Sequence, residues 1–228
     1  MFSSTATLRS PAMNLEEART YMLGQQIRAW DVMDSRVLDI LAKTPRELFV
    51  PDDYRELAFA DTDIPIAHGQ RMMCPKIEGR LLQALQLEPA HEVLEIGTGT
   101  GFLTACIAQF VEKVVSVEIF DGMTQKAKIK LQEQGIKNVE LQTKDAFSLK
   151  HSKKFDAVAV TGSVPEIDDH FVQMLKPSGR LFIIAGKAPV MDACLVTLHD
   201  NGEWTQQSLF ETVVAPLVNA EKSEPFLL

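Results

Sequence analysis

A glycine-rich loop is the part of the chain whose residue types and spacing most clearly predict chemistry. It follows a short apolar run, precedes a helical pattern and reads Glu95-Ile96-Gly97-Thr98-Gly99-Thr100-Gly101-Phe102. Glycine lets a chain turn sharply and lets its backbone approach a ligand closely. The dinucleotide-binding fingerprint G-x-G-x-x-G would have its third glycine where Phe102 stands. The spacing therefore predicts a nucleotide-like ligand other than a dinucleotide.

Three acids stand at the ends of successive predicted strands. Glu95 ends the first, Glu118 ends the second 21 residues after Gly97, and Asp145 follows the third. The carboxyl ends of parallel strands form one rim, where an acid binds ribose hydroxyls in open α/β sheets. S-adenosylmethionine offers such a rim an ammonium, a ribose and an adenine amino group, and it carries no phosphate. The three acids therefore predict S-adenosylmethionine as the cofactor, although singly Glu95 or Asp145 could cap a helix and Glu118 could be a surface charge.

Strands and helices alternate around this loop, as hydrophobic periodicity and turn residues indicate. Helices are predicted at 15–48 with a break at 31–34, and at 76–87, 101–110, 121–134 and 165–175. Strands are predicted at 93–97, 114–119, 138–143, 155–162, 180–186, 193–200, 204–209 and 211–218, with a turn at 176–179 and a hairpin at Asn201-Gly202. Residues 59–75 are predicted to be a long loop with a short strand at 64–66, and such loops tend to be functional.

This alternation predicts an α/β fold. We expect a Rossmann-like, doubly wound, mostly parallel seven-stranded sheet, with an antiparallel C-terminal edge and an N-terminal helical extension. A single domain is expected over residues 1–228, in which 1–13 form a flexible leader, 14–90 the helical extension and substrate loop, and 91–228 the cofactor-binding sheet.

Composition excludes several classes of partner. The net charge is −8 and the lysines and arginines are scattered, apart from a helical cluster at Lys126, Lys128 and Lys130 that is read as a solvated face, so no nucleic acid partner is expected. No apolar run approaches the roughly 18 residues of a membrane span, and no secretory signal is recognisable, so no membrane partner is expected. The three cysteines are far apart, without metal-ligand spacing, which predicts reduced thiols, no metal and a cytoplasmic protein.

Blocks along most of the chain match the pattern of one known family. The most specific are RVLDILAKTPRELFVPDDYRELAFAD (36–61) and IPIAHGQ (64–70); LEIGTGTGF, SVEI, FDAVAVTG, LKPSGRL and VVAPLV also fit. With these blocks the chain resembles the protein-L-isoaspartate O-methyltransferases. The resemblance implies methyl transfer from S-adenosylmethionine to the α-carboxylate of isoaspartyl residues in damaged proteins. A protein or peptide substrate is therefore expected. The alternatives are another acceptor, including a small molecule, or a non-catalytic S-adenosylmethionine-binding module.

The chain departs from this family directly after His-Gly-Gln. The family usually reads T-x-S-x-P there, whereas this chain has Arg71 at the threonine position and Met73 at the serine position. Methionine cannot donate a hydrogen bond. Arg71 would pair with the acceptor carboxylate or else point to solvent, and Met73 would line an apolar acceptor pocket or else fill core. Asp61 matches the family's loop acid and would orient the substrate or else form an Asx-turn.

The predicted site has two parts. The acceptor side is predicted to use Asp61, Arg71 and Met73. The cofactor is predicted to be held by residues of the substrate loop, the glycine loop and the strand ends: His68, Gln70, Glu95, Gly97, Thr98, Gly99, Gly101, Glu118, Ile119, Asp145, Ala146 and Thr161. His68 is expected to hold backbone geometry rather than act as a base, and Cys74 is not expected to be a nucleophile.

Overall fold

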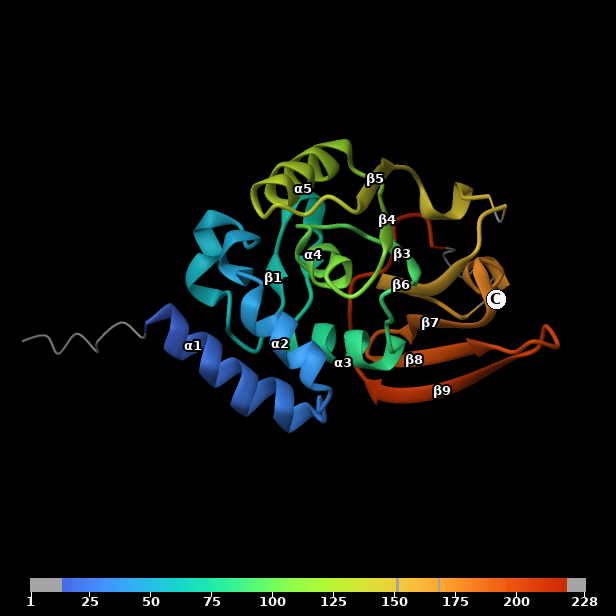
Figure 1. Cartoon of the computed structure of the whole chain (residues 1–228), viewed down its shortest axis with the longest axis horizontal. Helices are drawn as coiled ribbons and strands as arrows, with labels where there is room; N and C mark the ends of the chain where they lie inside the picture. The colour runs from blue at the N-terminus through green and yellow to red at the C-terminus, as the bar shows by residue number, and fades with distance from the viewer. Residues whose placement is uncertain (1–13, 151, 168, 221–228) are drawn as a thin grey trace, which may run out of the picture.

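A seven-stranded sheet forms the centre of the computed structural model, which describes residues 14–150, 152–167 and 169–220. Its strand order is β5-β4-β3-β6-β7-β8-β9, and the five strands from β5 to β7 are parallel. The strands are β3 (Glu92–Ile96), β4 (Lys113–Glu118), β5 (Val139–Thr143), β6 (Phe155–Val164), β7 (Leu175–Lys187), β8 (Val190–Leu198) and β9 (Trp204–Glu211). β8 and β9 pair antiparallel at the edge, where they form a long hairpin (Figure 1). The predicted fold class is confirmed.

Both faces of the central strands β3, β4 and β6 are buried, as their near-continuous apolar sequences require. Val93 and Val114 belong to a core with α3 (Pro75–Leu85), α4 (Phe102–Ala108) and α5 (Asp121–Glu133). Leu94 and Val115 point the other way, into a second core with α6 (Asp169–Val172) and the short 3-10 helix η6 (Ala146–Ser148).

The N-terminal helices lie before the sheet in the chain. They are α1 (Leu15–Tyr21), the π-helical η1 (Met22–Ile27), η2 (Arg28–Trp30), α2 (Ser35–Lys43), η3 (Arg46–Leu48) and η4 (Asp52–Leu57). Of these, η1, α2 and η3 contact α3. The N-terminal segment approaches α3 closely at Gly79, where an added Cβ would lie 3.2 Å from side-chain atoms of Ile27 and Val32.

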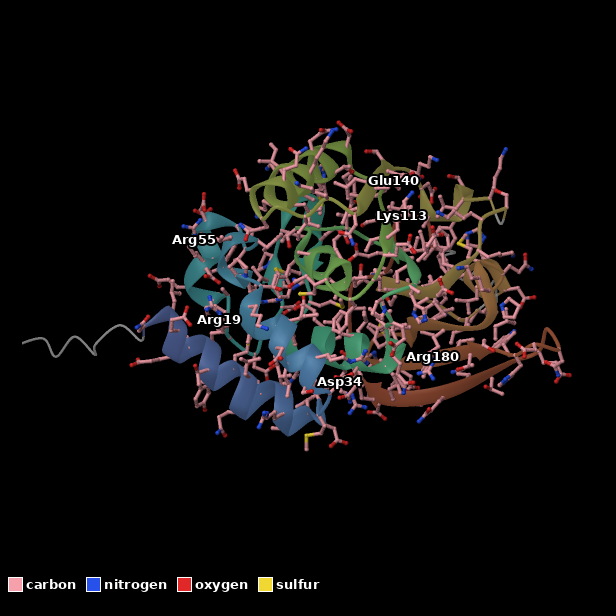
Figure 2. The ribbon with its side chains drawn as sticks, viewed as in Figure 1. Arg19, Asp34, Arg55, Lys113, Glu140 and Arg180 are labelled. Atoms are coloured by element: carbon pink, nitrogen blue, oxygen red, sulfur yellow. The ribbon has the colours of Figure 1, made fainter. Side chains whose placement is uncertain are left out.

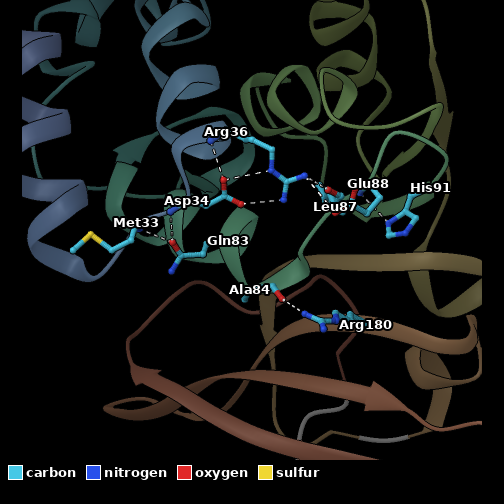
Figure 3. A network of polar contacts seen from close by, with 9 residues as sticks. All are labelled: Met33, Asp34, Arg36, Gln83, Ala84, Leu87, Glu88, His91 and Arg180. Atoms are coloured by element: carbon cyan, nitrogen blue, oxygen red, sulfur yellow. Dashed lines mark hydrogen bonds and ion pairs between the residues drawn. The ribbon is translucent and has the colours of Figure 1, made fainter.

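Polar bonds fix α3 between these helices and the sheet (Figure 3). The Gln83 side-chain oxygen accepts the backbone N–H groups of Met33 at 2.6 Å and Asp34 at 3.0 Å. From β7, Arg180 donates to the carbonyl of Ala84 at 3.3 Å. Helix α3 therefore has a defined position beside the cleft described below.

The predicted substrate loop contains its own small hairpin. β1 (Ile64–Pro65) pairs antiparallel with β2 (Arg71–Met72), and η5 (Ala67–Gly69) lies between them. The short strand predicted at 64–66 is present at 64–65. The loop is therefore an ordered element that precedes α3 directly.

Three predicted elements near the C-terminus were wrong. The helix expected at 165–175 is confined to α6, and the turn expected at 176–179 is a bulge inside β7, because Leu175 and Arg180 both pair with β6. No separate strand is present at 211–218, because β9 ends at Glu211. After Glu211 the chain crosses the end of β6, where Ser163 and Pro216 form an isolated bridge. The predicted leader, 1–13, lies outside the described residues.

Figure 2 shows the side chains on the ribbon, with Lys113 and Glu140 among those labelled. Lys113 and Glu140 form one ion pair across β4 and β5, with 2.6 Å between Nζ and Oε2. Within the described ranges, no helix is long and apolar enough to cross a membrane.

Candidate active site

A cleft opens at the carboxyl ends of the central strands. It holds about 1120 Å³ of space not filled by atoms, its open mouth included. Four segments contribute most of its wall: 70–74, 96–100, 117–120 and 213–218. The glycine loop, the end of β4, the substrate loop and the segment after β9 thus meet around one space, as parallel strand ends do in open α/β folds.

The glycine loop needs its glycines. The φ angles of Gly97, Gly99 and Gly101 are +92°, +56° and +88°, a region that side chains strongly disfavour. A Cβ on Gly97 would overlap the Thr161 hydroxyl, which donates to the carbonyls of Ile96 at 2.8 Å and Gly97 at 3.0 Å. The loop is therefore a backbone cradle held from behind by β6.

Glu118 occupies the rim where the sequence predicts it. Its carboxylate is 5% exposed, lines the cleft, and accepts the backbone N–H groups of Gly99 at 3.0 Å and Phe120 at 3.1 Å. Each carboxylate oxygen has a second lone pair, so the group retains acceptor capacity toward a ligand.

Glu95 lies beneath the glycine loop and does not line the cleft. It is fully buried, and its Oε2 accepts the hydroxyls of Thr104 at 2.5 Å and Ser116 at 2.6 Å. Its Oε1 has no hydrogen-bond partner in the described part of the chain. Burial raises the pKa of Glu95 to about 7, against the opposing effect of the two hydroxyls. Thr98, which lines the cleft, shares a 2.6 Å hydrogen bond with Ser116.

Asp145 acts as a helix cap. Its Oδ1 accepts the N–H of Phe147 at 2.9 Å, and its Oδ2 accepts from the Asn219 side chain at 2.8 Å. Its neighbour Ala146 lines the cleft, whereas the Asp145 side chain does not. The carboxylate thus ties the C-terminal segment to the end of β5.

Arg71 and Asp63 form an exposed ion pair at the cleft. Arg71 donates from Nε to the Asp63 carboxylate, and from Nη2 to Oδ1 at 3.1 Å. The hydrogen bond from Arg71 holds the pKa of Asp63 below its usual value. The Arg71 side chain is 44% exposed, so it lies within reach of a ligand and of solvent.

Met73 both lines the cleft and belongs to the hydrophobic core. It is 7% exposed, and its carbonyl accepts from Arg46 Nη2 at 2.7 Å. Asp61 lies outside the cleft lining, where it accepts from the Cys74 thiol at 2.7 Å and pairs with Lys76 at 2.9 Å. Burial, reinforced by Asp61, raises the pKa of Cys74 to about 12.

His68 does not line the cleft; it lies in η5 with a left-handed φ of +58°. Its ring stacks on Phe120 with centroids 4.0 Å apart and planes 6° apart. Gln70, Ile119 and Phe120 line the cleft itself. Sequence reasoning missed Phe120, although it directly follows the strand predicted at 114–119.

Two further parts of the wall were missed. One is Glu78 on α3, which is 2% exposed and paired with the equally buried Arg46. The other is the segment 213–218, whose backbone bonds to Ser163 at 3.0 Å and 2.9 Å hold it across the end of β6.

A glycine cradle after the first parallel strand, with an acid at the end of the second, defines an α/β methyltransferase. A family model described as "Protein-L-isoaspartate(D-aspartate) O-methyltransferase (PCMT)" matches residues 18–222, and the chain belongs to this family. The resemblance inferred from the sequence is confirmed.

Individual relatives agree with the family match. A protein-L-isoaspartate O-methyltransferase of Petrotoga mobilis is 32% identical over 208 residues, which are 90% of this chain and 98% of the relative. One from Myxococcus xanthus is 38% identical over 156 residues, 68% of this chain and 74% of the relative. A crystal structure of a putative Plasmodium falciparum family member in complex with S-adenosyl-L-homocysteine shares the fold, with a TM-score of 0.73 at 19% identity, covering 87% of this chain and 97% of that one.

Proposed function

We propose that the chain is an S-adenosylmethionine-dependent O-methyltransferase that esterifies the α-carboxylate of L-isoaspartyl residues in damaged proteins or peptides. One observation carries the proposal: a single cleft joins the glycine cradle and Glu118 to the exposed guanidinium of Arg71, within the family match. The three cysteines are free, which supports the cytoplasmic location that the sequence predicts.

The residues of the cradle fit S-adenosylmethionine, which would supply an electrophilic methyl group on a sulfonium. Gly97 and Gly99 allow the backbone to approach the ligand, and Thr98, Gly101 and Thr161 shape the loop. Glu118 would bind the ribose hydroxyls.

The adenine side of the site has an aromatic edge. Ile119, Phe120 and Ala146 would enclose the adenine, with His68 stacked on Phe120 and Gln70 beside it. Asp145 would hold the shape of this edge from behind, through its cap of η6. The role predicted for Glu95 stays a prediction.

The acceptor side would align a carboxylate and exclude water. A carboxylate is already nucleophilic, so positioning is the main contribution asked of the protein. Arg71 would hold the acceptor by charge-assisted hydrogen bonds, and Met72, Met73 and the apolar segment 213–218 would keep water out. Asp61 would fix the loop through Cys74 and Lys76. A thiol with a pKa of about 12 does not serve as a nucleophile at neutral pH.

The family match favours this reaction over a different acceptor or a non-catalytic binding module, because it runs through the altered segment 71–75. The test is incubation with methyl-labelled S-adenosylmethionine and an isoaspartyl peptide, with the same peptide carrying ordinary aspartate as control. The expected result is base-labile methyl ester on the isoaspartyl peptide only. Tight cofactor binding without ester formation would contradict the proposal.

A further inference from the structure

A buried carboxylate faces the cleft from helix α3. Glu78 is 2% exposed, and the described residues include one partner for it, the Arg46 guanidinium, which pairs with Oε2. Arg46 is fixed in turn by the carbonyls of Ala58 at 2.8 Å and Met73 at 2.7 Å. Burial raises the pKa of Glu78 to about 7, and Arg46 opposes that rise. A buried carboxylate is costly unless both of its oxygens have partners, and Arg46 pairs with Oε2 alone, which leaves Oε1 available to a ligand.

Glu78 differs from the two other carboxylates in the described cleft wall. Asp63 is exposed, and both of its carboxylate oxygens accept hydrogen bonds from Arg71. Each carboxylate oxygen of Glu118 accepts one backbone N–H. Glu78 Oε1, by contrast, makes no hydrogen bond within the part of the chain that the structure describes. It is an acceptor without a donor, at the wall of a ligand site.

The position of Glu78 relative to the glycine cradle indicates which part of a ligand it meets. The Arg46 guanidinium lies 4.7 Å from the ring centroid of Phe102, the first residue of α4. Glu118 and Ala146 lie at the ends of β4 and β5, on the other side of the cradle. A ligand with its ribose at Glu118 and its base toward Ala146 therefore presents its opposite end to α3.

Glu95 is the other carboxylate near this end, and its geometry is less suited to a cation. Two hydroxyls already donate to its Oε2, and its Oε1, unpartnered among the described residues, is buried beneath the glycine loop, because Glu95 does not line the cleft. We propose that Glu78 binds the α-ammonium of the amino-acid tail of S-adenosylmethionine, an inference that rests on the proposed function. Arg46 is a positioning residue: it aims the carboxylate and balances its charge.

The test compares two ligands that differ in the tail, by calorimetric titration. S-adenosylhomocysteine carries the tail, and 5′-methylthioadenosine has the adenosine and thioether without it. Glu78→Gln should weaken S-adenosylhomocysteine about 10- to 100-fold, the range for a hydrogen bond to a charged group, and leave methylthioadenosine within about 2-fold. The matched control Glu118→Gln should weaken both ligands, since both have the ribose.

Two results overturn the inference alone. One is an unchanged affinity of folded Glu78→Gln for S-adenosylhomocysteine; the other is a tail-specific loss in Glu95→Gln but not in Glu78→Gln. A wild-type protein that binds neither ligand overturns the proposed function, and this inference with it.

Glu78→Gln leaves the Arg46 charge buried without an anion, so the variant is at risk of unfolding. The double variant Arg46→Met/Glu78→Gln removes both charges and should show the same tail-specific loss. The wild-type protein provides a third measurement, with the S-adenosylhomocysteine analogue that has hydrogen in place of the α-amino group. This analogue should bind about 10- to 100-fold more weakly than S-adenosylhomocysteine, and equal affinities of the two compounds would overturn the inference.

Discussion

The two halves of the cleft differ in what holds their residues in place. The cofactor half, residues 96–101 and 117–120, is a backbone cradle with three glycines at positive φ and a buried acid bonded to main-chain N–H groups. The acceptor half, residues 61–74, has the exposed Arg71–Asp63 pair at its surface. Exposed ion pairs contribute little to stability, whereas strained backbone depends on the whole surrounding fold. The exposed side chains of the acceptor half, Arg71 and Asp63, can therefore change at a small cost to stability.

The largest expected effect tests whether the backbone of the cofactor half is rigid, and it is at Gly97. The change Gly97→Ala places a Cβ against the Thr161 hydroxyl, at a φ of +92°. Backbone strain and overpacking cost about 4 kcal/mol together, so affinity for S-adenosylhomocysteine should fall about 1000-fold. Titration calorimetry measures this, with thermal unfolding to confirm the fold. Gly122→Ala is the matched control: its Cβ meets nothing within 4 Å in helix α5, and it should stabilise slightly. Equal effects of the two changes would contradict a rigid cradle.

The buried acid beneath the cradle makes stability depend on pH. The folded state holds the pKa of Glu95 at about 7, raised from 4.5 by burial. Between these values the folded state binds more protons than the unfolded chain, so the free energy of unfolding falls as pH rises from 4.5 to 7. Glu95→Gln should reduce this fall by about 3 kcal/mol, measured by urea unfolding at pH 5 and pH 8.

Glu140→Gln is the control for that measurement. Lys113 lowers the pKa of Glu140, whose side chain is 46% exposed, so its titration lies below the window and the fall should be unchanged. A pH dependence that is identical in wild type and Glu95→Gln would show that Glu95 is not the titrating group.

Met73 is one of the buried residues of the acceptor half, so its substitution should affect stability as substitutions in the cofactor half do. Met73→Ser removes a side chain that is 7% exposed and should lower the free energy of unfolding by about 2 kcal/mol. The new hydroxyl can donate to an acceptor carboxylate, so kcat/KM for an isoaspartyl peptide should rise about 5-fold below the unfolding temperature. Met33→Ser, at a side chain 71% exposed, should change neither quantity. A lower kcat/KM would instead show that the apolar surface of Met73 is what the acceptor uses.

Arg71 tests whether the acceptor half binds charge. Arg71→Ala should raise KM for the isoaspartyl peptide about 10-fold, since a charge-assisted hydrogen bond contributes about 1.4 kcal/mol or more. Its effect on affinity for S-adenosylhomocysteine should be negligible. Arg55→Ala is a close match, because Arg55 also forms an exposed pair with an aspartate, at 2.7 Å from Asp52 on η4, outside the cleft lining. A similar KM for both variants would show that Arg71 does not bind the acceptor.

Sequence reasoning places the glycine loop and Glu118 at the cleft but misses Glu78 and the segment 213–218, for a physical reason. The glycine spacing and Glu118 are local signals, since a strand, a turn and the next strand end are enough to place them. Glu78 is unrecognisable in this way, because its burial depends on Arg46, which lies 32 residues earlier in the chain. The segment 213–218 reads as a strand by its apolar residues, but its backbone bonds to Ser163 instead of extending the sheet. Such tertiary pairings leave no periodicity in the sequence.

Asp63 provides the smallest and most specific test of the acceptor half. Its carboxylate holds Arg71, with 3.1 Å between Oδ1 and Nη2, and it lines the cleft, so an incoming carboxylate must compete with it for the guanidinium. Asp63→Asn keeps an oxygen acceptor but removes the charge, and KM for the isoaspartyl peptide should fall about 2- to 5-fold, the range for an exposed ion pair. The gain should shrink as salt screens the wild-type pair. Asp52→Asn, which breaks the equivalent pair with Arg55 on η4, should leave KM unchanged. A higher KM in Asp63→Asn would mean that Asp63 orients the Arg71 guanidinium toward the acceptor rather than competing with the acceptor for it. The side chains of the acceptor half would then be as firmly positioned as the backbone of the cofactor half.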